Sequence, residues 1–327
     1  MPTSSPPPPV SSRSKRIAMV AVVLLLVVTA GCAVTPAREF QHSSFEGFPV
    51  ISYVPEQPRG LVYLFHGSNG SASFAERVET TDVLNRLIYQ GYGFVSTSST
   101  ERTGDRRWDV SSASTTANPD LARLARLHNH LVATTPVAAA TPLVGIGMSN
   151  GSRFVTLWGQ TWRNGGYPVK AIWASMGRIA GPVSASGALT VPTVFSAAVN
   201  DFTTPPRPIV IDYARTHEAG TPTELYVSQE RNLGQSPYLR IPGIDPAEAG
   251  QIVSALKATG VWNAAGERVV ADIQQAAAQA VTAQFPPSVA GQLSEISDQT
   301  ALQLAVHQFT AEYVAKVQAF FDRFVPR

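Results

Sequence analysis

The stretch that decides the fold reads Leu143-Val-Gly-Ile-Gly-Met-Ser-Asn-Gly-Ser-Arg-Phe154. The apolar residues 143–146 predict a buried strand, and residues 153–162 have the pattern of a helix. Between them lies Gly-x-Ser-x-Gly, with Ser149 at its centre. A serine on a tight strand-to-helix turn has strained backbone angles, and the two glycines remove side chains that would collide there. The spacing therefore predicts an exposed, nucleophilic Ser149 at a helix N-terminus, where partial positive charge favours developing negative charge.

Short β-branched segments alternate with helical segments along most of the chain. Strands are predicted at residues 50–54, 61–65, 93–97, 143–146, 169–174, 191–197 and 224–228, and helices at 74–90, 120–132 and 208–218. This alternation predicts an α/β fold with a mostly parallel central sheet flanked by helices. The uninterrupted apolar strands agree, because parallel sheets are buried on both faces. The polar Arg-Arg-Trp loop at residues 106–108 is interpreted as a solvated loop, with a contribution to a substrate pocket as the alternative.

Residues 240–300 break the alternation. An Asp-Pro-Ala-Glu sequence at 245–248 provides an N-cap, a proline at the first helical position and a glutamate at the third, so it predicts a helix start. An Ala- and Gln-rich helix is predicted at 267–285, and an amphipathic terminal helix at 300–324. We interpret residues 240–300 as a helical insertion or lid within one domain, residues 49–327.

The composition excludes several classes of function. The 327 residues include 25 Lys+Arg and 23 Asp+Glu, a net charge of +2, which leaves no basic face for nucleic acid. The single cysteine excludes a disulfide framework and a cysteine-ligated metal cluster. No His, Asp and Glu set has zinc-site spacing, and no phosphate-binding or dinucleotide-binding glycine motif is complete. We therefore expect neither a catalytic metal nor a cofactor.

Residues 147–151 in this context resemble the α/β-hydrolase family, especially its branch of exported polyhydroxyalkanoate depolymerases and feruloyl esterases. The second mark of the resemblance is the segment at 61–70, Leu-Val-Tyr-Leu-Phe-His-Gly-Ser-Asn-Gly, a strand that ends in His-Gly. In the family this turn and the residue after the nucleophile each provide a backbone N–H to an oxyanion hole, which implies Ser68 and Asn150 here. Such donors stabilise the charge on a carbonyl oxygen during attack. His66 precedes the nucleophile, so we interpret it as structural.

The family order of serine, then acid, then histidine directs the search for the acid. Asp201 follows the predicted strand at 191–197, and its turn resembles the acid turn of the family. The resemblance therefore implies Asp201 as the acid. Asp212 and Glu230 are the alternatives.

Two histidines, His217 and His307, lie downstream of Ser149. His217 falls in a predicted helix ahead of the last strand, where the family has no catalytic residue. His307 precedes the terminal helix, as the catalytic histidine of the family does, so the resemblance implies His307 as the base. About 80 residues separate it from the last predicted strand, so the insertion has to loop out between them.

The resemblance implies a serine hydrolase, most simply a carboxylesterase that forms an acyl-enzyme on Ser149 and acts on a small-molecule or polymeric ester. One alternative is a peptidase or a lipase on the same fold, with residues 240–300 as a lid. The other is a non-catalytic surface lipoprotein that keeps the fold as a binding scaffold.

Residues 1–31 have the pattern of an export signal. A positive cluster at 13–16 precedes an apolar run at 17–28, which is too short to span a bilayer as a helix. Small residues then lead to Cys32, and this resembles the lipobox of bacterial lipoproteins, in which the cysteine is lipidated and becomes the N-terminus. The resemblance implies a membrane-anchored lipoprotein that faces the periplasm or the cell exterior, tethered by residues 32–48. The alternative is an ordinary signal peptide with an incidental cysteine.

Replacement of Cys32 by serine tests the lipid anchor. We expect cells fed a labelled fatty acid to incorporate it into the wild-type protein and not into Cys32→Ser, because serine lacks the thiol to which the diacylglyceryl group is attached. The variant should also leave the membrane fraction, since two acyl chains anchor a protein stably and their loss removes the anchor. Labelling that persists in Cys32→Ser would contradict the lipoprotein interpretation.

Overall fold

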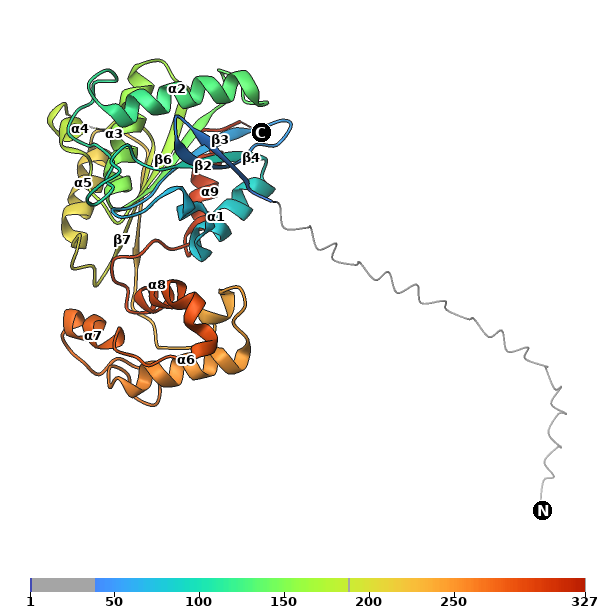
Figure 1. Cartoon of the computed structure of the whole chain (residues 1–327), viewed down its shortest axis with the longest axis vertical. Helices are drawn as coiled ribbons and strands as arrows, with labels where there is room; N and C mark the ends of the chain where they lie inside the picture. Colours follow the sequence, from blue (N-terminus) through green and yellow to red (C-terminus); the bar gives the residue numbers. More distant parts are fainter. Residues whose placement is uncertain (2–38, 188, 327) are drawn as a thin grey trace. The chain divides into compact units, whose positions relative to one another are not determined.

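The computed structural model describes Met1, residues 39–187 and residues 189–326. One compact unit, Glu39–Arg327, contains all the described helices and strands (Figure 1). The predicted signal segment after Met1 and Cys32 lie outside the described residues. None of the described helices is both long and apolar enough to cross a membrane.

An eight-stranded sheet forms the centre of this unit. Its order is β1-β2-β4-β3-β5-β6-β7-β8, in which the pairs β1/β2 and β2/β4 are antiparallel and all others are parallel. The strands are β1 (Gln41–Phe45), β2 (Phe48–Tyr53), β3 (Gly60–Phe65), β4 (Tyr92–Thr97), β5 (Leu143–Met148), β6 (Val169–Ser175), β7 (Thr193–Ala198) and β8 (Thr223–Ser228). The predicted α/β-hydrolase fold, a mostly parallel sheet flanked by helices, is thereby confirmed.

Helices cover both faces of the sheet (Figure 1). They are the 3-10 helix η1 (Ala72–Glu76), α1 (Val78–Tyr89), α2 (Pro119–Thr134), α3 (Asn150–Asn164), the short α4 (Gly181–Ala185), α5 (Pro206–Glu218) and α9 (Val314–Asp322). In β3, Leu61, Tyr63 and Phe65 belong to the core cluster that contains side chains of α2 and α3. Val62 and Leu64 belong to the cluster that contains side chains of α1 and α9. The strand is apolar throughout because it is buried on both faces.

The end of the predicted tether is part of the sheet. Residues 41–45 form β1, and residue 48 begins β2, so the predicted 32–48 tether is wrong over its last residues. The two strands are joined by a turn in which Glu46 and Gly47 both have positive φ. Most side chains of β1 are polar and exposed, because it is an edge strand, so the sequence carries no apolar alternation there.

The helix predicted at 300–324 is two helices. The first, α8 (Leu293–Gln303), and the second, α9, are separated by a loop at 304–313, in which Ala305 has a φ of 51°. The backbone N–H of Asn200, just beyond β7, donates to the carbonyl oxygen of Ala305 at 3.0 Å. This tertiary hydrogen bond holds the loop against the end of the sheet, which the apolar pattern of the segment does not reveal.

The helical insertion has a core of its own. It contains η2 (Tyr238–Arg240), α6 (Pro246–Ala258), α7 (Ile273–Ala280), η3 (Pro287–Gln292) and α8. Tyr238, Ile252 and Ile296 are buried in one cluster, to which no described strand contributes a side chain. The helix predicted at 267–285 is limited to α7, because Trp262 and Arg268 form a β-bridge and the chain turns into the helix only afterwards.

Glu79 of α1 links the insertion to the rest of the domain through hydrogen bonds. Its carboxylate is 4% exposed and accepts hydrogen bonds from Arg240 at 2.5 Å, from Gln299 at 3.0 Å and from the backbone N–H of Ala311 at 2.5 Å. Three separate segments, η2, α8 and the chain between α8 and α9, therefore meet at one buried charge. Arg240 also pairs with the exposed Asp82.

Substitution of Glu79 tests this attachment. We expect Glu79→Gln to lower the free energy of unfolding by about 3 kcal/mol, because it removes a buried charge that three donors require. The matched control is Asp82→Asn, which breaks the ion pair of the same arginine at a side chain that is 50% exposed and should cost less than about 1 kcal/mol. Urea denaturation measures both, and equal losses would contradict the role given to Glu79.

Candidate active site

Ser149 lies on the turn between β5 and α3 in a strained conformation, with φ 58° and ψ −116°. A Cβ on Gly147 would lie 2.1 Å from the carbonyl oxygen of Gly151, and a Cβ on Gly151 would lie 2.2 Å from that of Phe65. Both collisions are with backbone atoms, which a rotamer change cannot relieve. The glycines therefore have the role that the spacing predicted, since they let the first turn of α3 approach β3 and β5.

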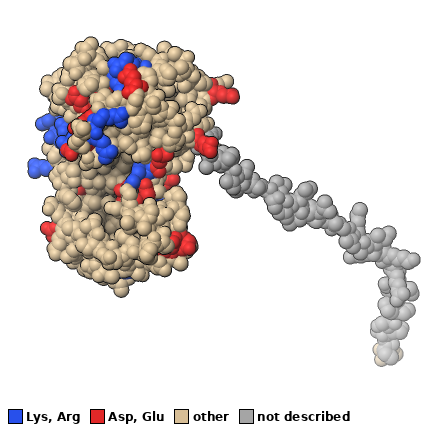
Figure 2. All heavy atoms as spheres, in the orientation of Figure 1, with Lys and Arg blue, Asp and Glu red and all other residues tan. Residues whose placement is uncertain are grey.

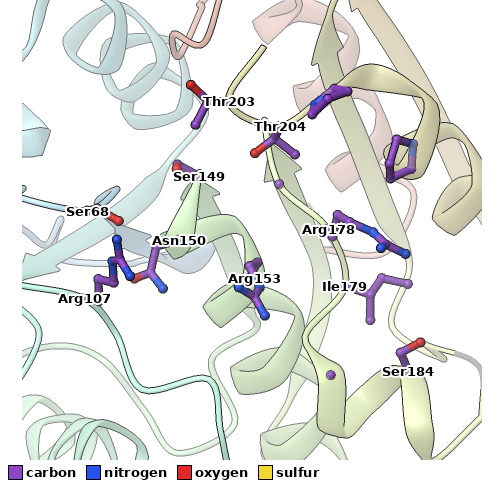
Figure 3. A pocket seen from close by; sticks show the side chains of 14 residues that line it. Ser68, Arg107, Ser149, Asn150, Arg153, Arg178, Ile179, Ser184, Thr203 and Thr204 are labelled. Atoms are coloured by element: carbon purple, nitrogen blue, oxygen red, sulfur yellow. The ribbon is translucent and has the colours of Figure 1, made fainter. Parts of the chain in front are cut away.

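The two backbone donors predicted for an oxyanion hole, Ser68 and Asn150, flank Ser149. Ser68 lies in the loop after β3, and its N–H has no hydrogen-bond partner among the described residues. Asn150 is the first residue of α3, so its N–H has no intrahelical acceptor. Both residues line the same cavity as Ser149 (Figure 3). Their assignment to an oxyanion hole remains a prediction that this arrangement permits.

The structure brings Asp201 and His307 together. Asp201 follows β7, and its Oδ1 accepts hydrogen bonds from the backbone N–H groups of Thr203 at 2.9 Å and Thr204 at 2.8 Å. Its Oδ2 accepts from Nδ1–H of His307 at 2.6 Å. The carboxylate side chain is 0% exposed and the imidazole 15%. This arrangement fixes the ring and leaves Nε2 as the proton acceptor.

Nε2 of His307 is buried and has no hydrogen-bond partner among the described residues. No hydrogen bond joins it to Ser149, so the third contact of the predicted triad is not made in this structure. Thr203 and Thr204, which hold Asp201, line the same cavity as Ser149, and Figure 3 shows them beside it. Hydrogen bonds of this kind are often long or misaligned before substrate binds.

The alternative acid and base residues, Asp212, Glu230 and His217, form hydrogen bonds with other side chains. Asp212 binds Arg178 through both carboxylate oxygens, at 3.0 and 3.1 Å. Glu230 binds Arg268 in the same way, at 2.7 and 2.9 Å. His217 is exposed on α5, and its ring nitrogen contacts a threonine hydroxyl at 3.2 Å. None of the three forms a hydrogen bond with Ser149.

His66 is a buried structural residue. Its Nε2 accepts from the backbone N–H of Ser99 at 3.1 Å, so Nδ1 carries the proton and donates to the carbonyl oxygen of Gly67 at 2.7 Å. Burial lowers the pKa of His66 to about 4, because the charged imidazolium is desolvated. The neutral ring holds the loop that carries Ser68.

Trp108 is buried, so the prediction of a solvated loop at 106–108 is wrong for this residue. Its indole N–H donates to the carbonyl oxygen of His66 at 3.0 Å, and its backbone N–H donates to the side-chain oxygen of Asn150 at 2.7 Å. Both partners are 42 positions away in the sequence, so no local pattern signals the contact. Trp108 thus fixes the side chain of Asn150 beside Ser149.

A cavity of about 670 Å³ opens at Ser149. Its lining consists of small polar residues, three arginines and a few apolar contacts: Ser68, Arg107, Ser149, Asn150, Arg153, Gly177, Arg178, Ile179, Gly181, Ser184, Thr203, Thr204, Pro205 and Pro208. None of these residues comes from the predicted lid at 240–300. Within the described part of the chain, no group of three His, Cys, Asp or Glu side chains is placed to hold a metal ion. The cavity has the size of a site for a small molecule or for one segment of a polymer.

No protein-family model and no curated protein matches the sequence. Among solved structures, a thermostable esterase matches with 14% identity and a TM-score of 0.44, over 59% of this chain and 55% of that one. Est1E from Butyrivibrio proteoclasticus with bound ferulic acid matches with 14% identity and a TM-score of 0.42, over 58% of this chain and 89% of that one. The esterase PE8 matches with 17% identity and a TM-score of 0.43, over 68% of this chain and 99% of that one.

The low pKa of His66 makes stability depend on pH. Between about pH 6.5 and pH 4 the unfolded chain binds a proton at His66 that the folded chain does not, so acidification favours unfolding. We expect the wild type to lose about 3 kcal/mol relative to His66→Asn between pH 7 and pH 4. Denaturant titrations across this range measure the difference, with the exposed His217→Asn as control. Parallel pH profiles for wild type and His66→Asn would contradict the assignment.

Proposed function

We propose that the protein is a serine hydrolase that cleaves a carboxylic ester, with Ser149, His307 and Asp201 as its catalytic residues. The observation that carries the proposal is the 2.6 Å hydrogen bond between His307 and the buried Asp201. The threonines that hold Asp201 line the cavity into which the strained Ser149 opens. A buried carboxylate on Nδ1 orients an imidazole for proton transfer at Nε2.

In the proposed reaction, Oγ of Ser149 attacks the ester carbonyl carbon while Nε2 of His307 takes its proton. Asp201 stabilises the imidazolium that forms. The backbone N–H groups of Ser68 and Asn150 receive the negative charge on the carbonyl oxygen. Collapse of the tetrahedral intermediate breaks the bond to the alcohol, which leaves with the proton of His307. Water, deprotonated by His307, then hydrolyses the acyl-enzyme and releases the acid.

A carboxylesterase is favoured over a peptidase or a lipase by the resemblance of residues 147–151 to exported esterases. A peptidase, a lipase and a non-catalytic binding scaffold are the alternatives that assays can separate. Hydrolysis of short esters, but not of triglycerides or aminoacyl amides, supports the carboxylesterase. A folded protein that does not react with any of these substrates supports the scaffold.

We further propose that the enzyme is exported and anchored by a lipid on Cys32, facing the periplasm or the cell exterior. The proposal is supported by the positive cluster and the apolar run of residues 1–31 and by the small residues before Cys32. The described domain begins at Glu39, and its first strand starts at Gln41, so the segment between the proposed anchor and the sheet is short.

A fluorophosphonate probe tests the catalytic assignment, because it phosphonylates an activated serine. We expect the wild type to be labelled and Ser149→Ala not to be. We expect His307→Ala to lose activity on short esters by about 10³-fold or more, since the serine then has no base. Gel fluorescence and initial rates measure these effects.

The exposed His217 provides the matched control for His307. His217→Ala should keep wild-type labelling and rates, since it contacts neither Asp201 nor Ser149. Equal labelling of wild type and Ser149→Ala would contradict the proposed nucleophile, and loss of activity in His217→Ala alone would move the base to that residue.

A further inference from the structure

Three arginines border the cavity at Ser149, and no acidic side chain is found in its lining among the described residues. Arg107 comes from the loop after β4, Arg153 from the first turn of α3, and Arg178 from the loop after β6 (Figure 3). On the face drawn in Figure 2, the Lys and Arg side chains over the part that holds the sheet lie among Asp and Glu side chains, so the absence of acidic side chains is particular to the cavity lining. The cavity is therefore positively charged, although the net charge of the whole chain is only +2.

The three arginines differ in how far their charge is compensated. Arg178 is neutralised by the buried Asp212, which binds it through both carboxylate oxygens. Arg107 pairs with Asp105 at 2.5 Å, but both side chains are more than half exposed, so this ion pair is weak. Arg153 is exposed, and its guanidinium has no hydrogen bond or ion pair among the described residues. It is the uncompensated cation beside Ser149.

Carboxylates in a neighbouring hollow form no ion pair with Arg153. Arg107 and Arg153 also border this hollow, whose lining includes Glu101, Asp109 and Asp120. Each carboxylate accepts a hydrogen bond from a backbone N–H, at 2.5, 2.8 and 2.6 Å respectively. None forms an ion pair with Arg153 within 4.0 Å.

The position of Arg153 relative to Ser149 is suited to bind a charge on the substrate. The two residues are one helical turn apart, about 6 Å along the axis of α3, and both border the same cavity. A guanidinium binds a carboxylate through two parallel hydrogen bonds. The N-terminal end of α3 adds partial positive charge of the same sign.

We propose that the substrates are esters that bear a carboxylate, and that Arg153 binds this charge while Ser149 attacks the ester. The inference rests on the proposed function, and it names the substrate class of that site. The positive cavity also raises the local concentration of anionic esters, so the preference should weaken as salt screens the charges.

Two matched pairs of esters test the preference. One pair is 4-nitrophenyl hydrogen adipate and its isostere with a methyl ketone in place of the carboxylate; the other is 4-acetoxybenzoate and 4-acetoxyacetophenone. For at least one pair, we expect the ratio of kcat/KM for the anionic to the neutral ester to fall about tenfold in Arg153→Gln. It should also fall in wild type when NaCl is raised. Arg163→Gln, at an exposed position on the same helix, is the control that should keep the wild-type ratio.

Binding provides a readout that does not depend on turnover. In Ser149→Ala, monomethyl adipate should bind more tightly than methyl 6-oxoheptanoate by calorimetry, and Arg153→Gln should reduce its affinity about tenfold. If no ester is hydrolysed but this binding difference holds, the proposed reaction is wrong and the charge preference stands. If the kinetic ratios and the affinities are the same with and without Arg153, the charge preference is overturned.

Discussion

The site depends on one close backbone approach, that of the first turn of α3 to the sheet. Gly151 lies against the carbonyl oxygen of Phe65, and Gly147 lies against Gly151, so neither position has room for a Cβ. This contact holds Ser149 at a φ of 58°. It also brings the N-terminal N–H groups of α3 to the loop that carries Ser68. The positions of Ser149 and of the N–H groups of Ser68 and Asn150 thus follow from two missing side chains.

Asp201 and His307 belong to segments that are distant from Ser149 in the sequence. Asp201 follows β7 and lies at the same edge of the sheet as Ser149, because the carboxyl ends of parallel strands meet at one edge. His307 follows the insertion in the sequence, and two hydrogen bonds hold the loop in which it lies. The N–H of Asn200 binds the carbonyl oxygen of Ala305, and the carboxylate of Glu79 binds the N–H of Ala311. The insertion therefore contributes the placement of the imidazole rather than any lining of the cavity.

Local patterns predicted the parts of the molecule that local forces determine. The other strands and the glycine-flanked turn at Ser149 were predicted from local patterns, since buried parallel strands are apolar throughout and tight turns need glycine. The strand at 41–45 was not predicted, because it lies at the edge of the sheet and its mostly polar residues show no apolar alternation. The burial of Trp108 and the break before α9 were not predicted either, since both depend on hydrogen bonds to residues distant in the sequence.

The central claim is that Ser149, His307 and Asp201 act as one catalytic unit, and a crystal structure of the protein after reaction with an alkyl fluorophosphonate tests it most directly. The account predicts phosphorus bonded to Oγ of Ser149 and the phosphonyl oxygen about 3 Å from the N–H groups of Ser68 and Asn150. It also predicts that Nε2 of His307 forms a hydrogen bond to Oγ or to the phosphonate. Phosphorus on another residue, or an imidazole that stays out of hydrogen-bond reach, would contradict it.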